Sequence, residues 1–231
     1  FRYAIGIIFA FASSIALISA EQSEIERLDQ SIEANPNSAY AFQQRGALHF
    51  MEGAFIQAIA DFDRVIELLP EQEAGHWQRG IAYYYAGQYE KGVRQFELHQ
   101  TVNSNDVENA IWHFICKART DGFEAARQGI IPIKYDSRVP MMEVWDLFAG
   151  KGSIEKVLES AQRKGPNGAA SRQSLCYAHL YLGLYYEALE ESSLAKRHIG
   201  LAANEYSMDN YMGGVARTHA RALIHDLAEP Y

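Results

Sequence analysis

The sequence predicts an all-α protein, a right-handed superhelix of stacked helical hairpins of the α-solenoid kind. Three observations predict this fold class. Residue types recur along the chain at a spacing of 34 residues, a period typical of helical repeat proteins. Small residues alternate with aromatic ones inside each period, as two closely crossing helices require. Prolines stand between the periods, where one helix has to end before the next begins.

The composition excludes several other classes of protein. The chain has 231 residues, of which 48% are hydrophobic and 22% charged, as in an ordinary globular protein. Its 29 Asp and Glu outnumber 21 Lys and Arg, so the formal net charge is -8 and we expect no nucleic-acid partner. Two cysteines are too few for a disulfide-built scaffold or a four-cysteine metal site.

Residues 1–20 have the composition of a targeting segment. Arg2 precedes an uncharged apolar run that ends at Ala20, and Glu21 then opens a charged stretch. A cleaved signal peptide and an uncleaved membrane anchor both fit this pattern, and both alternatives stay open. We expect export to the periplasm or cell envelope, with membrane contact through this segment alone if it stays uncleaved.

Seven segments are expected along the chain. They are a signal peptide or membrane anchor (1–20), an N-terminal helix (21–36), two repeats (37–104), a degenerate repeat (105–140), a short helical hairpin (141–168), a late repeat (169–207) and a C-terminal capping helix (208–231).

The N-terminal helix and the first two repeats show the clearest patterns. Apolar residues on one face predict an amphipathic helix from Glu21 to Ala34. In the first repeat we expect helices over 39–51 and 55–69, with Gly53 at the turn. Several residues then recur one period later: Pro36 as Pro70, Arg45-Gly46 as Arg79-Gly80, Gly53 as Gly87, and Phe62 as Phe96.

The later segments are less regular. Pro132 and Pro140 predict an extended loop, followed by helices over 141–149 and 153–164. The sequence Gly-Pro-Asn-Gly at 165–168 predicts a turn, and residues 209–227 a last helix.

The recurring residues resemble the tetratricopeptide repeat (TPR), whose two helices each carry a small and an aromatic residue at fixed places. The matching residues are Gly46, Ala58, Phe62 and Pro70 in the first repeat, Gly80, Tyr83 and Phe96 in the second, and Leu182, Gly183, Tyr186, Ala195, Ile199 and Ala202 in the late one. His49 and Ser104 depart from the pattern. The repeat at about 107–130 keeps Phe123, Ala126 and Ile130.

The whole layout resembles the NlpI-type TPR proteins of the bacterial envelope. That resemblance implies a homodimeric scaffold that brings cell-wall hydrolases and a protease together. The first cysteine is Cys116, so the lipoprotein attachment site of that pattern is absent from this sequence.

Catalytic and cofactor motifs are absent, and we expect no enzyme activity, cofactor or metal. The sequence contains no G-x-S-x-G, H-E-x-x-H or G-x-G-x-x-G. The glycines at 149–153 favour a helix–helix turn over a phosphate loop. Glu190-Glu191 and the acidic residues Asp61, Asp63 and Glu67 are interpreted as solvated helix faces.

The two cysteines leave three alternatives open. His113 and Cys116, and likewise Cys176 and His179, stand three residues apart and would share a helix face. A zinc site built from both pairs, a Cys116–Cys176 disulfide, and two buried thiols are all compatible with this spacing, and we favour the thiols.

A binding groove is the functional hypothesis that the repeats favour. The inner helices of TPR stacks line a concave side, and in this sequence those positions are aromatic and apolar. The predicted groove residues are Tyr40, Gln43, Phe50, Met51, Trp77, Ile81, Tyr84 and Tyr85. The charged clamp of chaperone-binding TPRs is absent from them. Either a protein partner or peptide segment occupies this groove, or the protein's own N-terminal helix or a second copy covers it.

A second aromatic stripe lies in the late repeat. Tyr177, Tyr181 and Tyr185 are spaced to share one helix face, which favours a core stripe over a binding site.

The expected function is therefore a non-catalytic protein–protein interaction scaffold or adaptor of the cell envelope. The alternative is a membrane-tethered structural or assembly subunit of a larger complex.

Overall fold

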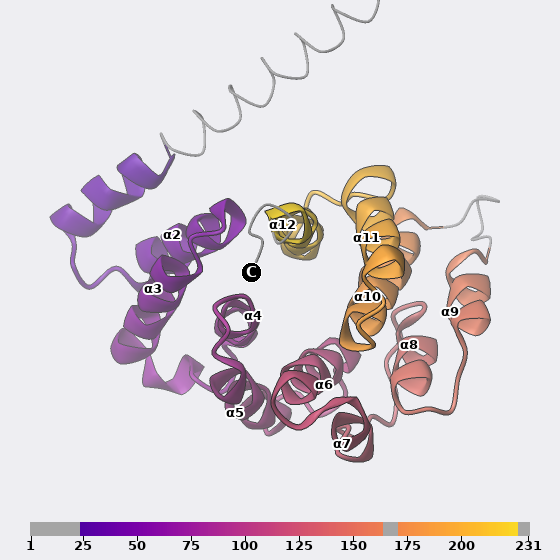
Figure 1. Cartoon of the computed structure of the whole chain (residues 1–231). Coiled ribbons are helices and arrows are strands. Elements are labelled where there is room, and N and C mark those ends of the chain that lie inside the picture. Colours follow the sequence, from indigo (N-terminus) through magenta and orange to yellow (C-terminus); the bar gives the residue numbers. More distant parts are fainter. Residues whose placement is uncertain (1–23, 164–170, 226–231) are drawn as a thin grey trace, which may run out of the picture.

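The fold is a curved stack of helices whose last helix lies inside the curve (Figure 1). The computed structural model describes residues 24–163 and 171–225. Regular structure within these residues is helical throughout, which confirms the predicted fold class. The targeting segment at 1–20 and the turn at 165–168 lie outside the described residues. No described helix combines the length and hydropathy needed to cross a bilayer.

The first helix pair follows the repeat pattern closely. A helix over residues 24–34 precedes α2 (Ala39–Glu52), whose first turn is capped by the Ser38 hydroxyl accepting a hydrogen bond from the Ala41 N–H at 3.3 Å. Gly53 ends α2 with φ of 85°, a left-handed conformation that favours glycine. The chain can therefore reverse within two residues and begin α3 (Phe55–Leu68).

The remaining elements continue the stack of pairs. They are the short 3₁₀ turn η1 (Pro70–Gln72), α4 (Trp77–Tyr85), α5 (Tyr89–Gln100), α6 (Val107–Asp121), α7 (Phe123–Gln128), α8 (Met141–Phe148), α9 (Ile154–Ala161), α10 (Arg172–Ala188), α11 (Ser192–Gly200), the π-helical turn η2 (Leu201–Glu205) and α12 (Tyr211–His225). Residues 130–138 form the expected non-helical link between α7 and α8.

Glycines in the first helix of each early pair let its backbone lie against an aromatic ring of the second helix. A Cβ added at Gly46 would lie 2.7 Å from the Phe62 ring, and one at Gly80 would lie 2.7 Å from the Phe96 ring. The late repeat repeats this arrangement with an aliphatic partner, since a Cβ at Gly183 would lie 2.5 Å from Ile199. The small and large residues of the pattern are therefore the contacts between the two helices of each pair.

The repeated arginines bind the second helix of their own pair. Arg45 donates two hydrogen bonds to the Asp61 carboxylate at 2.9 and 2.6 Å, and one period later Arg79 Nε donates to Gln95 at 3.0 Å. Asp61 is only 4% exposed. The prediction of a solvated face is therefore wrong for Asp61, because its charge is paired with the arginine of the facing helix.

The two cysteines are free and buried in separate helix contacts. Cys116 packs against Gly92, where an added Cβ would lie 2.6 Å from its sulfur. Burial raises the pKa of both thiols, that of Cys176 to about 11. The disulfide alternative is not what the structure has, and His113 faces Glu97 at 3.6 Å rather than a cysteine. Across the described ranges, no cluster of three or more metal-ligating side chains is found.

The glycine-rich sequence at 149–153 is the turn between α8 and α9. Gly150 adopts φ of 72°, and Lys151 folds back so that its ammonium lies 4.9 Å from the centre of the Trp145 ring. This arrangement is a helix–helix connection in which the lysine covers an aromatic side chain.

Helix α12 follows the late repeat as expected, but it does not stay at that end of the stack. It contacts α11 and η2 and also α2, at the opposite end of the described chain. In Figure 1 it lies inside the curve, facing α2 and α4 on one side and α10 and α11 on the other. The concave surface is therefore crossed by a helix of the same chain.

Candidate functional site

The middle of the concave surface is a cluster of aromatic rings from α2, α3 and α4. Phe50 lies 5.3 Å from Tyr85 and 5.5 Å from Phe55, measured between ring centres. Tyr84 and Tyr85 both reach Trp112 of α6, at 5.8 and 6.1 Å. The predicted groove residues Phe50, Ile81 and Tyr84 thus belong to the buried core, and Met51, Trp77 and Tyr85 are partly buried against it.

Helix α12 packs directly on this surface. The Tyr211 ring stacks on Phe50 at 5.6 Å and meets the Trp77 ring edge-on at 5.1 Å. The Met51 carbonyl accepts hydrogen bonds from Thr218 at 3.4 Å and from the Arg221 guanidinium. The predicted groove residues Phe50, Met51 and Trp77 therefore already hold a helix.

The element that covers the aromatics differs from the one expected. The sequence suggested the N-terminal helix or a second copy, whereas α12 provides the contact. The helix over 24–34 lies beside α2 instead, where Asp29 pairs with Arg45 at 2.7 Å. This difference arises because α12 carries its own aromatic and apolar face, through Tyr211, Met212 and Val215.

The predicted groove residues differ in how far they are exposed. Tyr40 is 73% exposed at the start of α2. Gln43 donates a hydrogen bond to Gln78 of α4 at 2.7 Å, so it links the two inner helices. Trp77 and Tyr85 are half-buried, whereas Ile81 and Tyr84 are buried.

The buried carboxylate of Glu187 on α10 contacts side chains of α4, α6 and α12. Glu187 of α10 accepts hydrogen bonds from the Tyr84 hydroxyl at 2.9 Å and from Arg119 at 2.6 Å. His219 of α12 lies 2.8 Å from its other oxygen, and the Tyr85 hydroxyl lies 2.8 Å from the opposite ring nitrogen of His219. The sequence predicted a groove with few charges, but α6, α10 and α12 bring this charged group to it.

Electrostatics favour the ionised form of Glu187. Burial by itself would raise its pKa, but the charges of His219 and Arg119 and the Tyr84 hydroxyl outweigh burial and lower the pKa to about 2. A cavity of about 530 Å³ opens beside this group, with Glu52, Phe55, Tyr89 and Leu223 among its walls.

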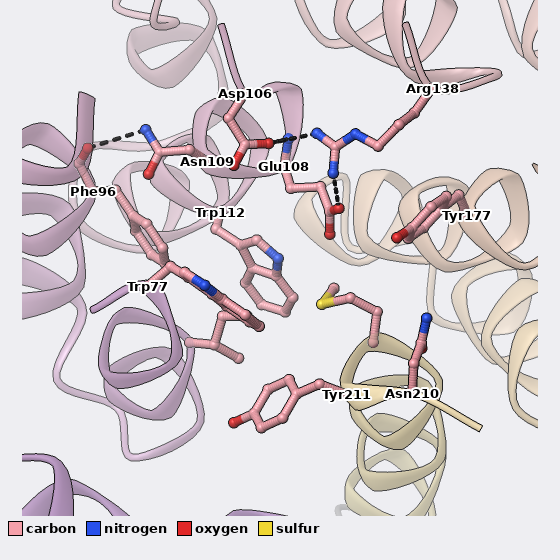
Figure 2. Close-up of a pocket in the computed structure, with 12 residues that line it drawn as sticks. Trp77, Phe96, Asp106, Glu108, Asn109, Trp112, Arg138, Tyr177, Asn210 and Tyr211 are labelled. Atoms are coloured by element: carbon pink, nitrogen blue, oxygen red, sulfur yellow. Dashed lines mark hydrogen bonds and ion pairs between the residues drawn. The ribbon is translucent and has the colours of Figure 1, made fainter. Parts of the chain in front are cut away.

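A second cavity, of about 310 Å³, lies at the start of α12. We call it the aromatic–acidic cavity, after the side chains in Figure 2. Its lining residues are Trp77, Ile81, Phe96, Asp106, Glu108, Asn109, Trp112, Arg138, Tyr177, Asn210, Tyr211 and Met212. They come from α4, α5, α6, α10 and α12 and from the loops before α6, α8 and α12.

Sequence reasoning found only part of this arrangement. Trp77 and Ile81 were predicted from the repeat pattern, and the stripe of Tyr177, Tyr181 and Tyr185 is buried as the core interpretation expects. Glu108, Arg138 and Tyr211 were missed. The pairing of Arg138 with an acid 30 residues away leaves no periodic signal, because it depends on how the loop at 130–138 folds back.

The chain is similar to a described relative in sequence and to a solved structure in fold. No family model matches the chain. A relative described as "Protein SGT1 homolog" from Bos taurus is 29% identical over 168 residues, covering 70% of this chain and 47% of that protein. The chain thus spans about half the length of this curated relative. A solved tetratricopeptide repeat protein from Parabacteroides merdae superimposes with a TM-score of 0.51 at 15% identity, covering 90% of this chain and 80% of that one.

These similarities show a TPR-like fold. The structural neighbour is too distant in sequence to indicate more than the arrangement of helices. The arrangement buries most of the aromatic cluster beneath α12 and leaves two cavities beside this helix.

Proposed function

We propose that the protein is a non-catalytic interaction scaffold whose concave surface takes up a segment of a protein partner. The observation that carries this proposal is the packing of α12 on Phe50, Met51 and Trp77. A surface that accepts one amphipathic helix has the shape and the apolar anchors that a second segment requires. Aromatic residues of this kind supply most of the affinity in such contacts.

The partner segment would lie beside α12, over the exposed side chain of Tyr40 and the accessible part of Trp77. Holding a partner there would let the scaffold act as an adaptor, since two proteins bound to one chain have a raised effective concentration. The TPR-like fold supports this function in general terms.

The test is alanine substitution at the surface. Trp77→Ala is expected to weaken partner binding by about 2 kcal/mol or more, because it removes a large half-buried ring from the concave surface. The partner is first identified by affinity capture, and its dissociation constant is then measured for each variant.

The matched control is Ile56→Ala. Ile56 is 60% exposed on α3, the second helix of the first pair, and its removal is expected to leave affinity unchanged. Helical circular dichroism must match the parent protein for both variants. A folded Trp77→Ala protein that binds the partner as tightly as the parent would place the site elsewhere.

The setting of the scaffold is a separate proposal. Residues 1–20 support export to a cell envelope, and the resemblance to NlpI-type proteins supports a homodimer that recruits cell-wall hydrolases or proteases. Mass spectrometry of the mature N-terminus tests the first part, since a chain that begins at Glu21 has been cleaved. Sedimentation of the purified protein tests the second.

A further inference from the structure

The aromatic–acidic cavity carries more negative charge than its cation neutralises. Arg138 donates hydrogen bonds to Asp136 at 3.0 Å from Nε, to Asp106 at 2.6 Å from Nη2, and to Glu108. Of the described residues that line the cavity, Arg138 is the one cation. Asp106 and Glu108 line the cavity with Arg138, so the charged lining residues leave a formal charge of -1. Asp136, which pairs with the same guanidinium outside the lining, adds a further negative charge.

Glu108 is the carboxylate that faces the cavity from α6. Its second oxygen accepts a hydrogen bond from the Tyr181 hydroxyl at 2.6 Å. Burial raises the pKa of Glu108 despite the adjacent Arg138. A second cation in the cavity would balance the negative charge that Arg138 leaves on Asp106 and Glu108.

Aromatic rings form much of the remaining wall. In Figure 2 the Glu108 side chain extends between Trp112 and Tyr177, with Trp77 and Tyr211 completing the ring of labelled side chains. The faces of such rings attract organic cations, and this attraction grows when the cation is removed from water.

Two buried polar atoms in the wall have no hydrogen-bond partner. One is the side-chain oxygen of Asn109, whose amide nitrogen already donates to the Phe96 carbonyl at 3.1 Å. The other is the indole N–H of Trp112. Asn109 is 2% exposed and Trp112 is 1% exposed, so leaving these atoms unpaired is costly. The indole N–H suits a carbonyl oxygen of a ligand.

The size of the cavity limits the ligand. Its volume of about 310 Å³ is close to the lower end of the range for small-molecule sites. Asn210 at its rim is exposed, which leaves an entrance beside α12. A single extended side chain with its adjoining peptide group fits these limits better than a large cofactor.

We propose that the aromatic–acidic cavity binds an alkylammonium group, namely a lysine side chain of the partner segment on the concave surface. The inference rests on the proposed function, because that segment would pass Trp77. This residue belongs to the concave surface and also lines the cavity. The ammonium would lie among the rings near Glu108, and a peptide carbonyl would accept a hydrogen bond from the Trp112 indole N–H.

The test uses small probes and needs no partner. N-acetyl-lysine methylamide is titrated into the protein and the indole N–H resonances of the three tryptophans are followed by NMR. We expect a saturable shift of the Trp112 signal. Trp145 is an internal control, because its indole N–H already donates to the Ile131 carbonyl at 2.9 Å.

Two further probes identify the chemistry. The norleucine analogue has the same stem without the charge and is expected not to bind. Butylammonium has the charge without the peptide carbonyl and is expected to bind more weakly. Equal binding of the norleucine analogue would overturn the cation assignment. Butylammonium binding as tightly as the lysine probe would overturn the lysine assignment in favour of a free amine.

Two glutamate variants distinguish binding in the cavity from attraction by the general surface charge. Glu108→Gln is expected to weaken the lysine probe by about tenfold or more, since it removes a buried charge facing the ligand. Glu159→Gln removes an exposed charge on α9 and is expected to change affinity by less than about twofold. If Glu108→Gln does not fold, Tyr177→Leu removes a ring face from the wall while keeping it apolar, and the same weakening is expected.

The outcomes also separate this inference from the proposed function. A lysine probe that leaves the Trp112 signal unmoved at saturating concentrations overturns the inference. If Trp77→Ala still weakens partner binding in that case, the concave scaffold stands and only the cavity assignment fails.

Discussion

Single glycines decide how closely the helices of each pair approach. Gly183 is a clear case, because an added methyl would lie 2.5 Å from two atoms of Ile199 and 3.2 Å from its backbone nitrogen. The branched side chain of Ile199 is fully buried and has no free space into which it can turn. The contact therefore tolerates no larger residue without moving a helix.

Gly183→Ala is expected to destabilise the protein by about 1–3 kcal/mol through overpacking. Gly200→Ala is the matched control, since an added Cβ there meets nothing within 4 Å and alanine favours the helix by up to about 1 kcal/mol. Urea unfolding with an unchanged slope measures both. Equal midpoints for the two variants would show that α10 and α11 are not packed as closely as described.

The ionisation of the Glu187 side chain makes the stability of the folded protein depend on pH. Its pKa of about 2 in the folded protein lies below the ordinary value of 4.5, so the unfolded chain binds the proton more tightly. The stabilisation is complete above about pH 4.5 and is lost as the pH falls toward 2.

The matching experiment compares the parent protein with Glu187→Gln. The free energy of unfolding of the parent is expected to fall more steeply between pH 4.5 and 2 than that of the variant. Parallel curves would mean that the carboxylate is not held by His219 and Arg119.

At the scale of elements, α12 is held by contacts at its start and near its middle. Tyr211 packs near its start on Phe50 and Trp77, and His219 pairs further along with Glu187 and Tyr85. These contacts place the helix against α2, α4 and α10 together. The helix therefore limits how much of the concave surface a partner can reach.

His219→Ala is expected to loosen this helix without unfolding the repeats. Loss of the buried contact between His219 and Glu187 should speed amide hydrogen exchange in α12 by about tenfold. The exchange of α2 and α3 should be unchanged, and Gln57→Ala, at an exposed site on α3, should alter neither. If α12 exchanges at the parent rate in the His219 variant, other contacts hold the helix in place.

For the whole molecule, α12 joins the two ends of a curved stack. An open solenoid keeps only contacts between neighbouring repeats, so its curvature can vary. Here α12 contacts α2 early in the chain and α11 late in the chain. The curve is thereby closed (Figure 1). One cavity is lined by the start of α12 and the other by its later part.

The local pattern of the sequence determined the helix pairs. The spacing of Gly46 and Phe62, repeated by Gly80 and Phe96, was sufficient to predict the fold class and the contacts within each pair, because these contacts join residues close in sequence. The same spacing identified Trp77, Ile81 and Tyr84 as residues of the inner helices. Asp61 was misjudged, since its burial depends on an arginine of the facing helix.

Only the tertiary structure decided what lies in the groove. The approach of Tyr211 to Phe50 joins residues at opposite ends of the described chain, and the grouping of Glu108, Arg138 and Tyr177 depends on a loop and two separate helices. Such contacts depend on the curvature of the whole stack, which results from many small rotations between successive helix pairs. The periodic pattern of the sequence does not specify the total of these rotations. The sequence therefore determined the helix pairs, and the tertiary structure determined the site.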